Sequence, residues 1–565
     1  MSAESDLFKL PVLELSRSLQ DHTASISDLA ANYVIHCAIN KLHAVIKPVG
    51  IIGAGAAGLY AAMILQDLGI EYEILEANDR IGGRIFTHRF NGEAGRHAPK
   101  NTPERYDYFD VGAMRFPDIP FMNRVFDLIR RVRVDDLLVD YHLGVGNNLA
   151  YYNTRGPFRK SDIRPKSDPF GVSIASGGTV PEKYALAGTQ SWISKTFDPF
   201  RDLFREAYEG QNEEDRFYAF EKAWKTLMEQ DHHTTRGYMQ TQKEDQAPFP
   251  EPVVNWLETF HAGTGTYNAA FTESVMSSLN FNWPWPHLDP PSTPNAQITK
   301  WYCIDGGSDH IVYKMADALE SEPILKQRVT KMEKRGNRIV VTGVDTGGVR
   351  QWKRRYDQVI CTVPLGCLGA IDTDGLGLLY NHKQAIRALQ YHSSTKVGIK
   401  FKERWWEKAG VNQVIPTGPI RGGQSSTDTQ IRTCVYPSYG LYTLDAPGVL
   451  IASYTTAQDS RRIGVLAQDK GSVAGEMLLE QTLDELAKMH GISKKQFGPV
   501  EDYFAHNWDT DVFARARSRI MGLGSSGHRA TMGGCLPALK HPLGAAGSIL
   551  LARRRRCTMG GSWAR

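Results

Sequence analysis

The sequence lacks the paired cysteines that mark a metal site or a disulfide framework. Its seven cysteines are scattered through 565 residues and are never spaced as CxxC. An excess of one charge is also missing, because 66 Lys and Arg stand against 62 Asp and Glu, which gives a net charge of +4. We therefore expect no bound metal, no nucleic-acid partner and no membrane partner. Internal repeats and low-complexity tracts are absent as well.

The first residues, MSAESDLFKLPVLELSRSLQ, lack a basic region followed by an apolar one. This absence predicts that there is no secretory signal and makes the cytoplasm the default location, with a peroxisomal or other organellar location left open. A chain of this length is too long for one hydrophobic core, so we expect two or three domains.

One apolar run, VGIIGAGAAGLYAAMIL at residues 49–65, nearly reaches the length of a membrane span. Its glycines indicate a strand, a tight turn and a helix instead. In such a unit Gly53 makes the turn, Gly55 lets the backbone approach a pyrophosphate, and Gly58 lets helix and strand pack closely. Glu76, eighteen residues after Gly58 at the end of a second apolar strand, suits ribose hydroxyls. Dinucleotide binding is the favoured interpretation, and a glycine-rich core turn is the alternative.

A second glycine turn follows in EANDRIGGRIFTHRF, where Gly82 and Gly83 precede Arg84. Together with GAGAAGL, this stretch resembles the flavin-containing amine oxidase superfamily, with the FAD-dependent L-amino-acid oxidases as the nearest group. Later segments resemble the family in the expected order, among them WYCIDGGSDHIVYKMADAL and YDQVICTVPLGCL. The resemblance implies FAD rather than NAD. It also implies an α/β fold in which a discontinuous Rossmann-like FAD-binding domain joins a mixed-sheet substrate domain and a helical insertion.

The resemblance assigns roles residue by residue. Glu76 would bind the adenosine ribose, and Val329 would contact the adenine. Arg84 would lie near the pyrophosphate and ribityl chain, and the Gly112 to Met114 turn near the flavin ring. The full predicted cofactor-binding set is Gly53, Gly55, Ala56, Ala57, Gly58, Glu76, Ala77, Gly83, Arg84, Gly112, Ala113, Met114, Arg115 and Val329.

The expected domain boundaries follow these segments. The FAD-binding domain should comprise residues 47–116, 296–370 and 501–513, after an N-terminal extension at 1–46. Helical periodicity, as in RFYAFEKAWKTLMEQ, predicts a helical and substrate domain at 117–295, and the polar stretch 160–182 reads as a surface loop. Alternating segments such as TKVGIKF predict a substrate-domain sheet within 371–500. Residues 514–565 are expected to be aberrant.

Arg115 is the residue that points to a substrate class. It follows the turn that would touch the flavin, and an arginine there could bind a carboxylate through two parallel hydrogen bonds. Within the superfamily, GAMR at this point is typical of L-amino-acid oxidases. The alternative is a structural ion pair with Asp110 or Asp118.

Two further residues match family positions. Tyr436 matches a tyrosine that binds the same carboxylate, with a half-buried sheet tyrosine as the alternative. Lys396 matches the lysine that holds a water near flavin N5.

The resemblance implies hydride transfer from the amino acid to flavin N5. Hydrolysis of the imino acid then gives a keto acid and ammonia, and O₂ is reduced to H₂O₂. No side-chain base is nominated. The substrates would be a small amino acid or amine and O₂, with a homodimer left open. The alternatives are a monoamine or polyamine oxidase and a non-catalytic remnant with impaired FAD binding.

The tail departs from the family. Family members end with a motif of the form GEATSxxHGWVxGA, but this chain reads LARRRRCTMGGSWAR. If those residues come from suitable GC-rich codons, reading from the third base spells GEATSVHHGWVVGA. The single Met codon and the single Trp codon leave little freedom at three of these positions. We therefore predict that residues from about 514 onward are translated out of frame, which sequencing the transcript across codons 505 to 565 would test. Such a tail should leave the edge of the FAD-domain sheet incomplete.

Overall fold

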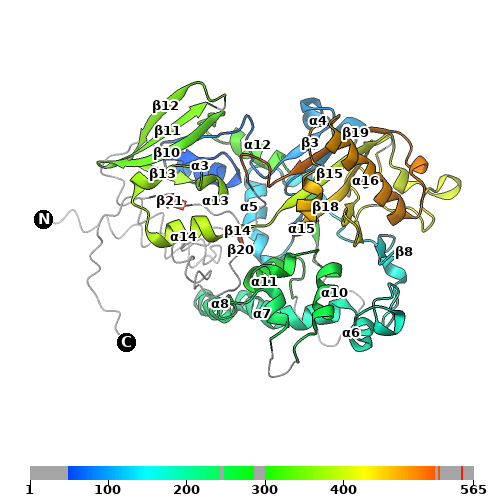
Figure 1. The fold of residues 1–565 in the computed structure, drawn as a ribbon. Helices are drawn as coiled ribbons and strands as arrows, with labels where there is room; N and C mark the ends of the chain where they lie inside the picture. The colour runs from blue at the N-terminus through cyan, green and yellow to red at the C-terminus, as the bar shows by residue number, and fades with distance from the viewer. Residues whose placement is uncertain are drawn as a thin grey trace.

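The structure is a computed structural model (Figure 1). It describes residues 49–210, 212–241, 247–261, 263–284, 299–345, 347–443, 445–515, 520–521 and 549–551. The half of the molecule predicted to bind FAD carries α3, β13 and the strands β10 to β12. The sheet that contains β15, β18 and β19 lies beside it, and the helices α6 to α11 form a third group next to both (Figure 1). The predicted extension at 1–46 lies outside the described residues.

The first sheet is the predicted βαβ unit. Strands β1 (Val49–Ile52), β2 (Tyr72–Leu75) and β13 (Gln358–Cys361) run parallel in the order β2-β1-β13. Helix α3 (Ala56–Asp67) makes the crossover from β1 to β2. All four residues of β1 are buried, as expected for a strand that is covered on both faces. Helix α12 (His310–Asp317) packs with α3 in one apolar core, so the segment at 301–319 does return to this domain.

The third glycine of the first turn is sterically required. A Cβ atom at Gly58 would lie 1.8 Å from the carbonyl oxygen of Gly53. No side chain fits at that distance, so helix α3 can approach the end of β1 only with glycine here. Gly53 itself has a φ of +104°, which favours glycine for a second reason.

Smaller elements complete this half of the molecule. They are β3 (Thr87–Arg89), α4 (Glu93–His97), β4 (Tyr108–Asp110), β5 (Phe116–Pro117), α5 (Asn123–Arg131), β6 (Leu138–Asp140), β9 (Trp301–Ile304), β10 (Gln327–Arg335), β11 (Arg338–Asp345), β12 (Gln351–Tyr356), α13 (Leu365–Leu368) and α14 (Tyr380–Ala388). Buried ion pairs join the β3–β4 hairpin region to the start of α12. Arg89 donates to both oxygens of Asp309 at 2.7 Å, and Arg105 donates to Asp305 at 2.8 Å.

The predicted substrate-domain sheet has seven strands in the order β19-β15-β18-β17-β16-β7-β8. Their bounds are β7 (Leu149–Tyr152), β8 (Arg155–Arg159), β15 (Ser394–Phe401), β16 (Gln424–Thr427), β17 (Thr433–Val435), β18 (Gly448–Thr456) and β19 (Val500–Asn507). Helices α15 (Ala457–Gly464) and α16 (Val473–His490) follow β18. The sheet therefore uses strands from three distant parts of the sequence.

Two expected boundaries differ from this arrangement. The expectation that residues 501–513 begin another FAD-domain segment is wrong for β19, because Val500–Asn507 pairs antiparallel with β15 at the edge of the substrate sheet. The region expected to be mainly helical also contributes β7 and β8, since β7 pairs parallel with β16. These short segments carry too little periodicity to separate strand from loop.

The helical group lies between β8 and β9 in the sequence. It contains α6 (Glu182–Ala187), α7 (Thr189–Glu209), α8 (Glu213–Met228), α9 (Thr235–Met239), α10 (Glu251–His261) and α11 (Phe271–Leu279). Their apolar faces meet in one core that includes Phe197, Phe204, Leu257 and Phe271. The three- and four-residue spacing of apolar positions predicted this group correctly.

Most of the tail lies outside the described residues, so the frame prediction stays a prediction. The described pieces are β20 (Ile520–Met521), which pairs antiparallel with β14 (Gln390–Tyr391), and β21 (Ile549–Leu551). Strand β21 pairs antiparallel with β13, so the sheet edge that was expected to be incomplete carries a three-residue strand. An apolar ILL segment is suited to pair beside a buried strand whatever its origin.

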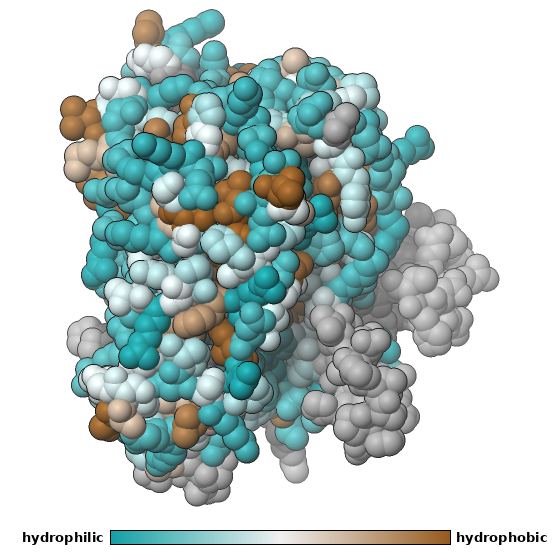
Figure 2. Space-filling view, turned by 90° about the vertical axis from the view of Figure 1, so that its right-hand side faces the viewer, coloured by the Kyte–Doolittle hydropathy of each residue, from teal (hydrophilic) through white to brown (hydrophobic). Residues whose placement is uncertain are grey.

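The face shown in Figure 2 is largely hydrophilic, with apolar residues in scattered patches. It belongs to the side of the molecule that carries β8, α6 and α16 (Figure 1). Among the described helices, none combines the length and the apolar character needed to cross a bilayer.

Candidate active site

The two glycine turns lie against each other at the N-terminus of α3. Gly55 forms a parallel bridge with Gly82, and a Cβ atom built on Gly83 would lie 3.5 Å from the Cα of Gly55. A Cβ on Gly55 itself would meet no atom within 4 Å. The first turn of α3 begins at Ala56 and Ala57, and no side chain from the described residues caps it. Its N–H groups are therefore available to bind a pyrophosphate.

The acid at the end of β2 is fixed by the backbone around it. One Glu76 oxygen accepts from the Ala54 N–H at 2.7 Å, and the other accepts from the Asn78 N–H at 2.8 Å. Burial raises the pKa of Glu76 above its ordinary value. The Gln327 N–H donates to the Glu76 backbone carbonyl at 2.7 Å, which brings the start of β10 and its buried Val329 close to this acid. Ala77 lies directly beside it.

Arg84 is the clearest sign of an absent anionic group. Its Nη1 atom is buried and has no hydrogen-bond partner among the described residues. Burial lowers the pKa of this guanidinium, and the nearby groups that raise it are Tyr391 and Cys367 rather than a carboxylate. A buried donor without a partner is costly, so a phosphate-bearing ligand would satisfy it. Gly112 packs on the same segment, because a Cβ there would lie 1.8 Å from the Arg84 carbonyl oxygen.

Lys396 fixes the turn that follows β4. Its Nζ atom donates to the carbonyls of Asp110 and Gly112, both at 2.8 Å, and contacts the Met114 sulfur at 3.4 Å. The lysine lies on β15 and is 2% exposed. The substrate-domain sheet thus holds the predicted flavin-facing turn, with Ala113 exposed at its centre. Its assignment to a flavin-bound water remains a prediction.

Arg115 has only neutral partners among the described residues. Its Nη1 atom lies 3.3 Å from the Gln424 Oε1 atom and 3.5 Å from the Tyr141 hydroxyl. The guanidinium carbon lies 5.0 Å from the centre of the Phe281 ring and 6.0 Å from that of Trp301. No carboxylate of the described part of the chain forms an ion pair with it. The alternative of a structural ion pair is therefore not what this structure contains.

Tyr436 is held in a buried hydrogen-bond network, and its role at a substrate carboxylate stays a prediction. It is fully buried, and its hydroxyl is 2.9 Å from the Ser425 hydroxyl and 2.6 Å from His490 Nε2. Side chains alternate along a strand. Val435 therefore packs in the cluster with Met114, whereas Tyr436 belongs to the core on the opposite face. The alternative of a half-buried sheet tyrosine agrees with these contacts, although the residue is fully buried.

Sequence reasoning missed Tyr141 and Gln424, the two polar neighbours of Arg115. They lie 26 and 309 residues away from it in the chain. Neither belongs to a local sequence motif. Tyr141 directly follows β6, and Gln424 begins β16 after two glycines. Arg115 and Tyr141 flank strands of the sheet β5-β9-β6, whereas Gln424 lies in the seven-stranded sheet. Only tertiary packing brings them together, so no local signal could have found them.

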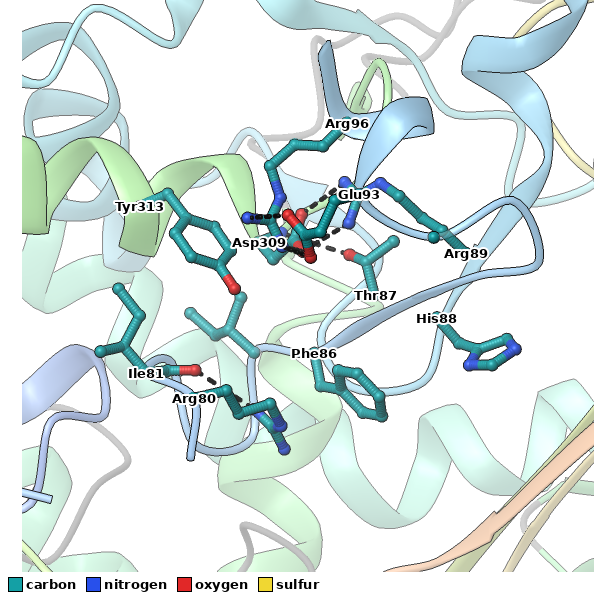
Figure 3. Close-up of a pocket in the computed structure, with 12 residues that line it drawn as sticks. Arg80, Ile81, Phe86, Thr87, His88, Arg89, Glu93, Arg96, Asp309 and Tyr313 are labelled. Atoms are coloured by element: carbon teal, nitrogen blue, oxygen red, sulfur yellow. Dashed lines mark hydrogen bonds and ion pairs between the residues drawn. The ribbon is translucent and has the colours of Figure 1, made fainter. Parts of the chain in front are cut away.

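A cavity of about 220 Å³ is lined by residues on both sides of the second glycine turn in the sequence, among them Ile81 and Phe86 (Figure 3). Arg89 and Arg96 enter it from β3 and α4, facing Asp309 and Tyr313. Both arginines already form ion pairs, with Asp309 at 2.7 Å and with Glu93 at 2.7 Å. Arg80 donates to the carbonyl of Gly83 and stacks 4.2 Å from the Phe86 ring. Because this charge is already paired, the cavity offers less to an anion than the unpaired Arg84 does.

Comparison with known proteins identifies the family. The sequence profile described as flavin-containing amine oxidoreductase matches residues 56–531. L-amino-acid oxidase 4 of Hebeloma cylindrosporum is 31% identical, over 82% of this chain and 71% of that protein. The flavin-dependent L-tryptophan oxidase of Lentzea aerocolonigenes is 27% identical, over 82% and 85%. A Dictyostelium discoideum protein with the provisional name bifunctional amine oxidase is 36% identical, and the chain spans only 41% of its length.

Solved structures agree on the fold. A double mutant of putrescine oxidase superposes with a TM-score of 0.54 at 17% identity, covering 84% of this chain and 88% of that one. The residues present also fit the cofactor of the family: paired glycine turns, an uncapped helix N-terminus, a buried acid for a ribose and an unpaired buried arginine. The chain therefore belongs to the flavin-containing amine oxidoreductases and takes FAD as its cofactor.

Proposed function

We propose that this chain oxidises L-amino acids to imino acids, which hydrolyse to keto acids and ammonia. The observation that carries the proposal is the uncompensated charge of Arg115, which lies directly after the flavin-facing turn. Its neighbours among the described residues are neutral or aromatic, so the guanidinium retains its full charge for a ligand. A carboxylate is the ligand that matches its planar, forked donors. The similarity to two amino-acid oxidases supports the same substrate class.

The residues of this chain would bind and orient the substrate. Arg115 would hold the carboxylate and thereby fix the position of Cα, while Lys396 keeps the turn at Gly112 in place through its two carbonyl contacts. Phe281, Tyr141 and Trp301 surround the guanidinium and would exclude water, which strengthens a charged hydrogen bond. Bound FAD would supply the chemistry, accepting hydride from Cα and passing the electrons to O₂ to give H₂O₂. Positioning is thus the contribution of the protein.

The competing function is oxidation of amines that carry no carboxylate, as the likeness in fold to putrescine oxidase allows. Release of H₂O₂ from phenylalanine and from phenethylamine separates the two, because these substrates differ only by the carboxylate. Faster turnover of the amine would refute the amino-acid proposal. Purified protein without a flavin absorbance spectrum would favour the non-catalytic remnant over either enzyme.

The variant Arg115→Ala tests whether this arginine binds the substrate carboxylate. We expect kcat/KM for phenylalanine to fall by about 2 to 4 kcal/mol of transition-state binding, roughly 30- to 1000-fold, while the flavin spectrum is retained. Arg164→Ala, at an exposed arginine, should leave both substrates unaffected and serves as the control. Unchanged phenylalanine kinetics in Arg115→Ala would mean that the arginine does not bind substrate.

A further inference from the structure

We propose that Gln424 is the positioning residue that keeps Arg115 available for a substrate carboxylate. This inference rests on the proposed function, because it explains how the same site would choose an acid over an amine. A glutamine oxygen can orient a guanidinium by accepting a hydrogen bond, and it adds no negative charge. A carboxylate at the same place would orient Arg115 equally well but would cancel its charge.

The backbone of Gln424 is fixed on both sides. Its N–H donates to the Asn148 Oδ1 atom at 3.1 Å, and its carbonyl accepts from the Lys160 Nζ atom at 2.9 Å. Asn148 is fully buried and also donates to the Gly422 carbonyl at 3.1 Å. The strand start is therefore held without help from the Gln424 side chain, which leaves that side chain for Arg115.

The register of the sheet decides which face Gln424 occupies. It pairs with Val435, and Val435 packs in the cluster that contains Met114 and Tyr141. The next residue, Ser425, points to the opposite face, where its hydroxyl contacts Tyr436. The Gln424 amide thus reaches Arg115 at 3.3 Å from the side on which the flavin-facing turn lies.

Lys160 adds to the positive character behind this residue. Burial lowers the pKa of its ammonium to about 8, so it is still largely protonated at neutral pH. No carboxylate in the described parts of the chain pairs with it, and the Gln424 carbonyl is its hydrogen-bond acceptor. One cation thus contacts the Gln424 backbone and another its side chain, and both positive charges favour an anionic ligand over a cationic one.

The test separates the charge of the ligand from its shape. Full-length protein saturated with FAD is titrated calorimetrically with 3-phenylpropionate, which is phenylalanine without its amine, and with phenethylamine. Gln424→Glu should weaken 3-phenylpropionate binding by about 10- to 100-fold, because the new carboxylate forms an ion pair with Arg115. Binding of phenethylamine should be unchanged or tighter. Gln468→Glu, at an exposed glutamine, adds the same charge elsewhere and should alter neither ligand by more than about twofold.

Weaker binding of 3-phenylpropionate without weaker binding of phenethylamine cannot come from a general loss of structure. Equal weakening of both ligands, or no effect on either, in a folded Gln424→Glu protein would overturn the inference. If the Gln424→Glu protein does not fold, the variant Gln424→Leu tests the role of Gln424 instead. It should weaken 3-phenylpropionate several-fold and leave phenethylamine unaffected, and any other pattern counts against the role. Failure of the proposed function is distinct, since wild-type protein would then prefer phenethylamine, and Arg115→Ala would not weaken 3-phenylpropionate.

Discussion

Replacing Lys396 with methionine should destabilise the fold and the flavin-facing turn together. The lysine is 2% exposed and donates to two carbonyls at 2.8 Å, those of Asp110 and Gly112. Methionine fills a similar volume, but it leaves both acceptors without this donor. A hydrogen bond from a charged group is worth about 1.5 to 3 kcal/mol. The variant also avoids the desolvation cost of a buried ammonium, which offsets part of this loss. We expect a net loss of about 2 to 4 kcal/mol in the free energy of unfolding.

Urea unfolding of the purified protein, followed by tryptophan fluorescence, measures this change. The midpoint should fall while the slope with urea stays constant, since the surface exposed on unfolding is unchanged. Lys402→Met is the matched control, because Lys402 directly follows the same strand and is exposed. Its free energy of unfolding should stay within about 0.5 kcal/mol of that of the wild type.

The flavin absorbance spectrum reports on the turn in the same samples. We expect weaker FAD retention in Lys396→Met, because the carbonyl contacts that hold residues 110 to 112 are lost. The loss of the cation should also raise the pKa of Asp110, which burial already raises to about 6. A variant with wild-type unfolding and FAD retention but much slower oxidation would refute this reasoning. It would assign Lys396 a purely chemical role at the flavin.

Two further predictions concern the buried network behind the sheet. Tyr436→Phe should lower the free energy of unfolding by about 1 to 3 kcal/mol, because His490 Nε2 loses its donor, and should leave KM for phenylalanine unchanged. A large rise in KM would restore Tyr436 to the substrate site. Burial lowers the pKa of His490 to about 4, below that of an exposed histidine, so the unfolded chain takes up a proton first. Stability should therefore fall as the pH drops from about 6.5 to 4, by about 3 kcal/mol, and His490→Gln should flatten this dependence in urea titrations.

The parts of the site that the sequence predicted are those built from neighbours in the chain. Gly53, Gly55 and Gly58 form one turn, and their spacing reflects a steric contact that the structure reproduces at Gly58. Glu76 follows from the length of one helix and one strand. Such features depend on local geometry, so a single sequence carries them.

Tyr436 shows where local sequence reasoning stops. A strand can be recognised from alternation, but a shift of one residue moves every side chain to the other face. The segment RTCVYPSYG contains two tyrosines and several small residues, so its pattern does not fix which face is buried. Pairing with β16 and β18 sets the face, and it directs Tyr436 to His490. Long-range pairing of this kind has no local signal.

The availability of Arg115 depends on where the neighbouring acids are bound, and this too requires the structure. Asp110, one of the two acids considered as a partner, accepts from Thr87 at 2.6 Å and from the Ser308 N–H at 2.9 Å. Its carboxylate is thereby directed toward the β3 hairpin and the start of α12, away from the arginine. Asp118 is exposed and forms no ion pair with Arg115. The positive charge proposed to select the substrate thus exists because other contacts already hold the acid five residues before it.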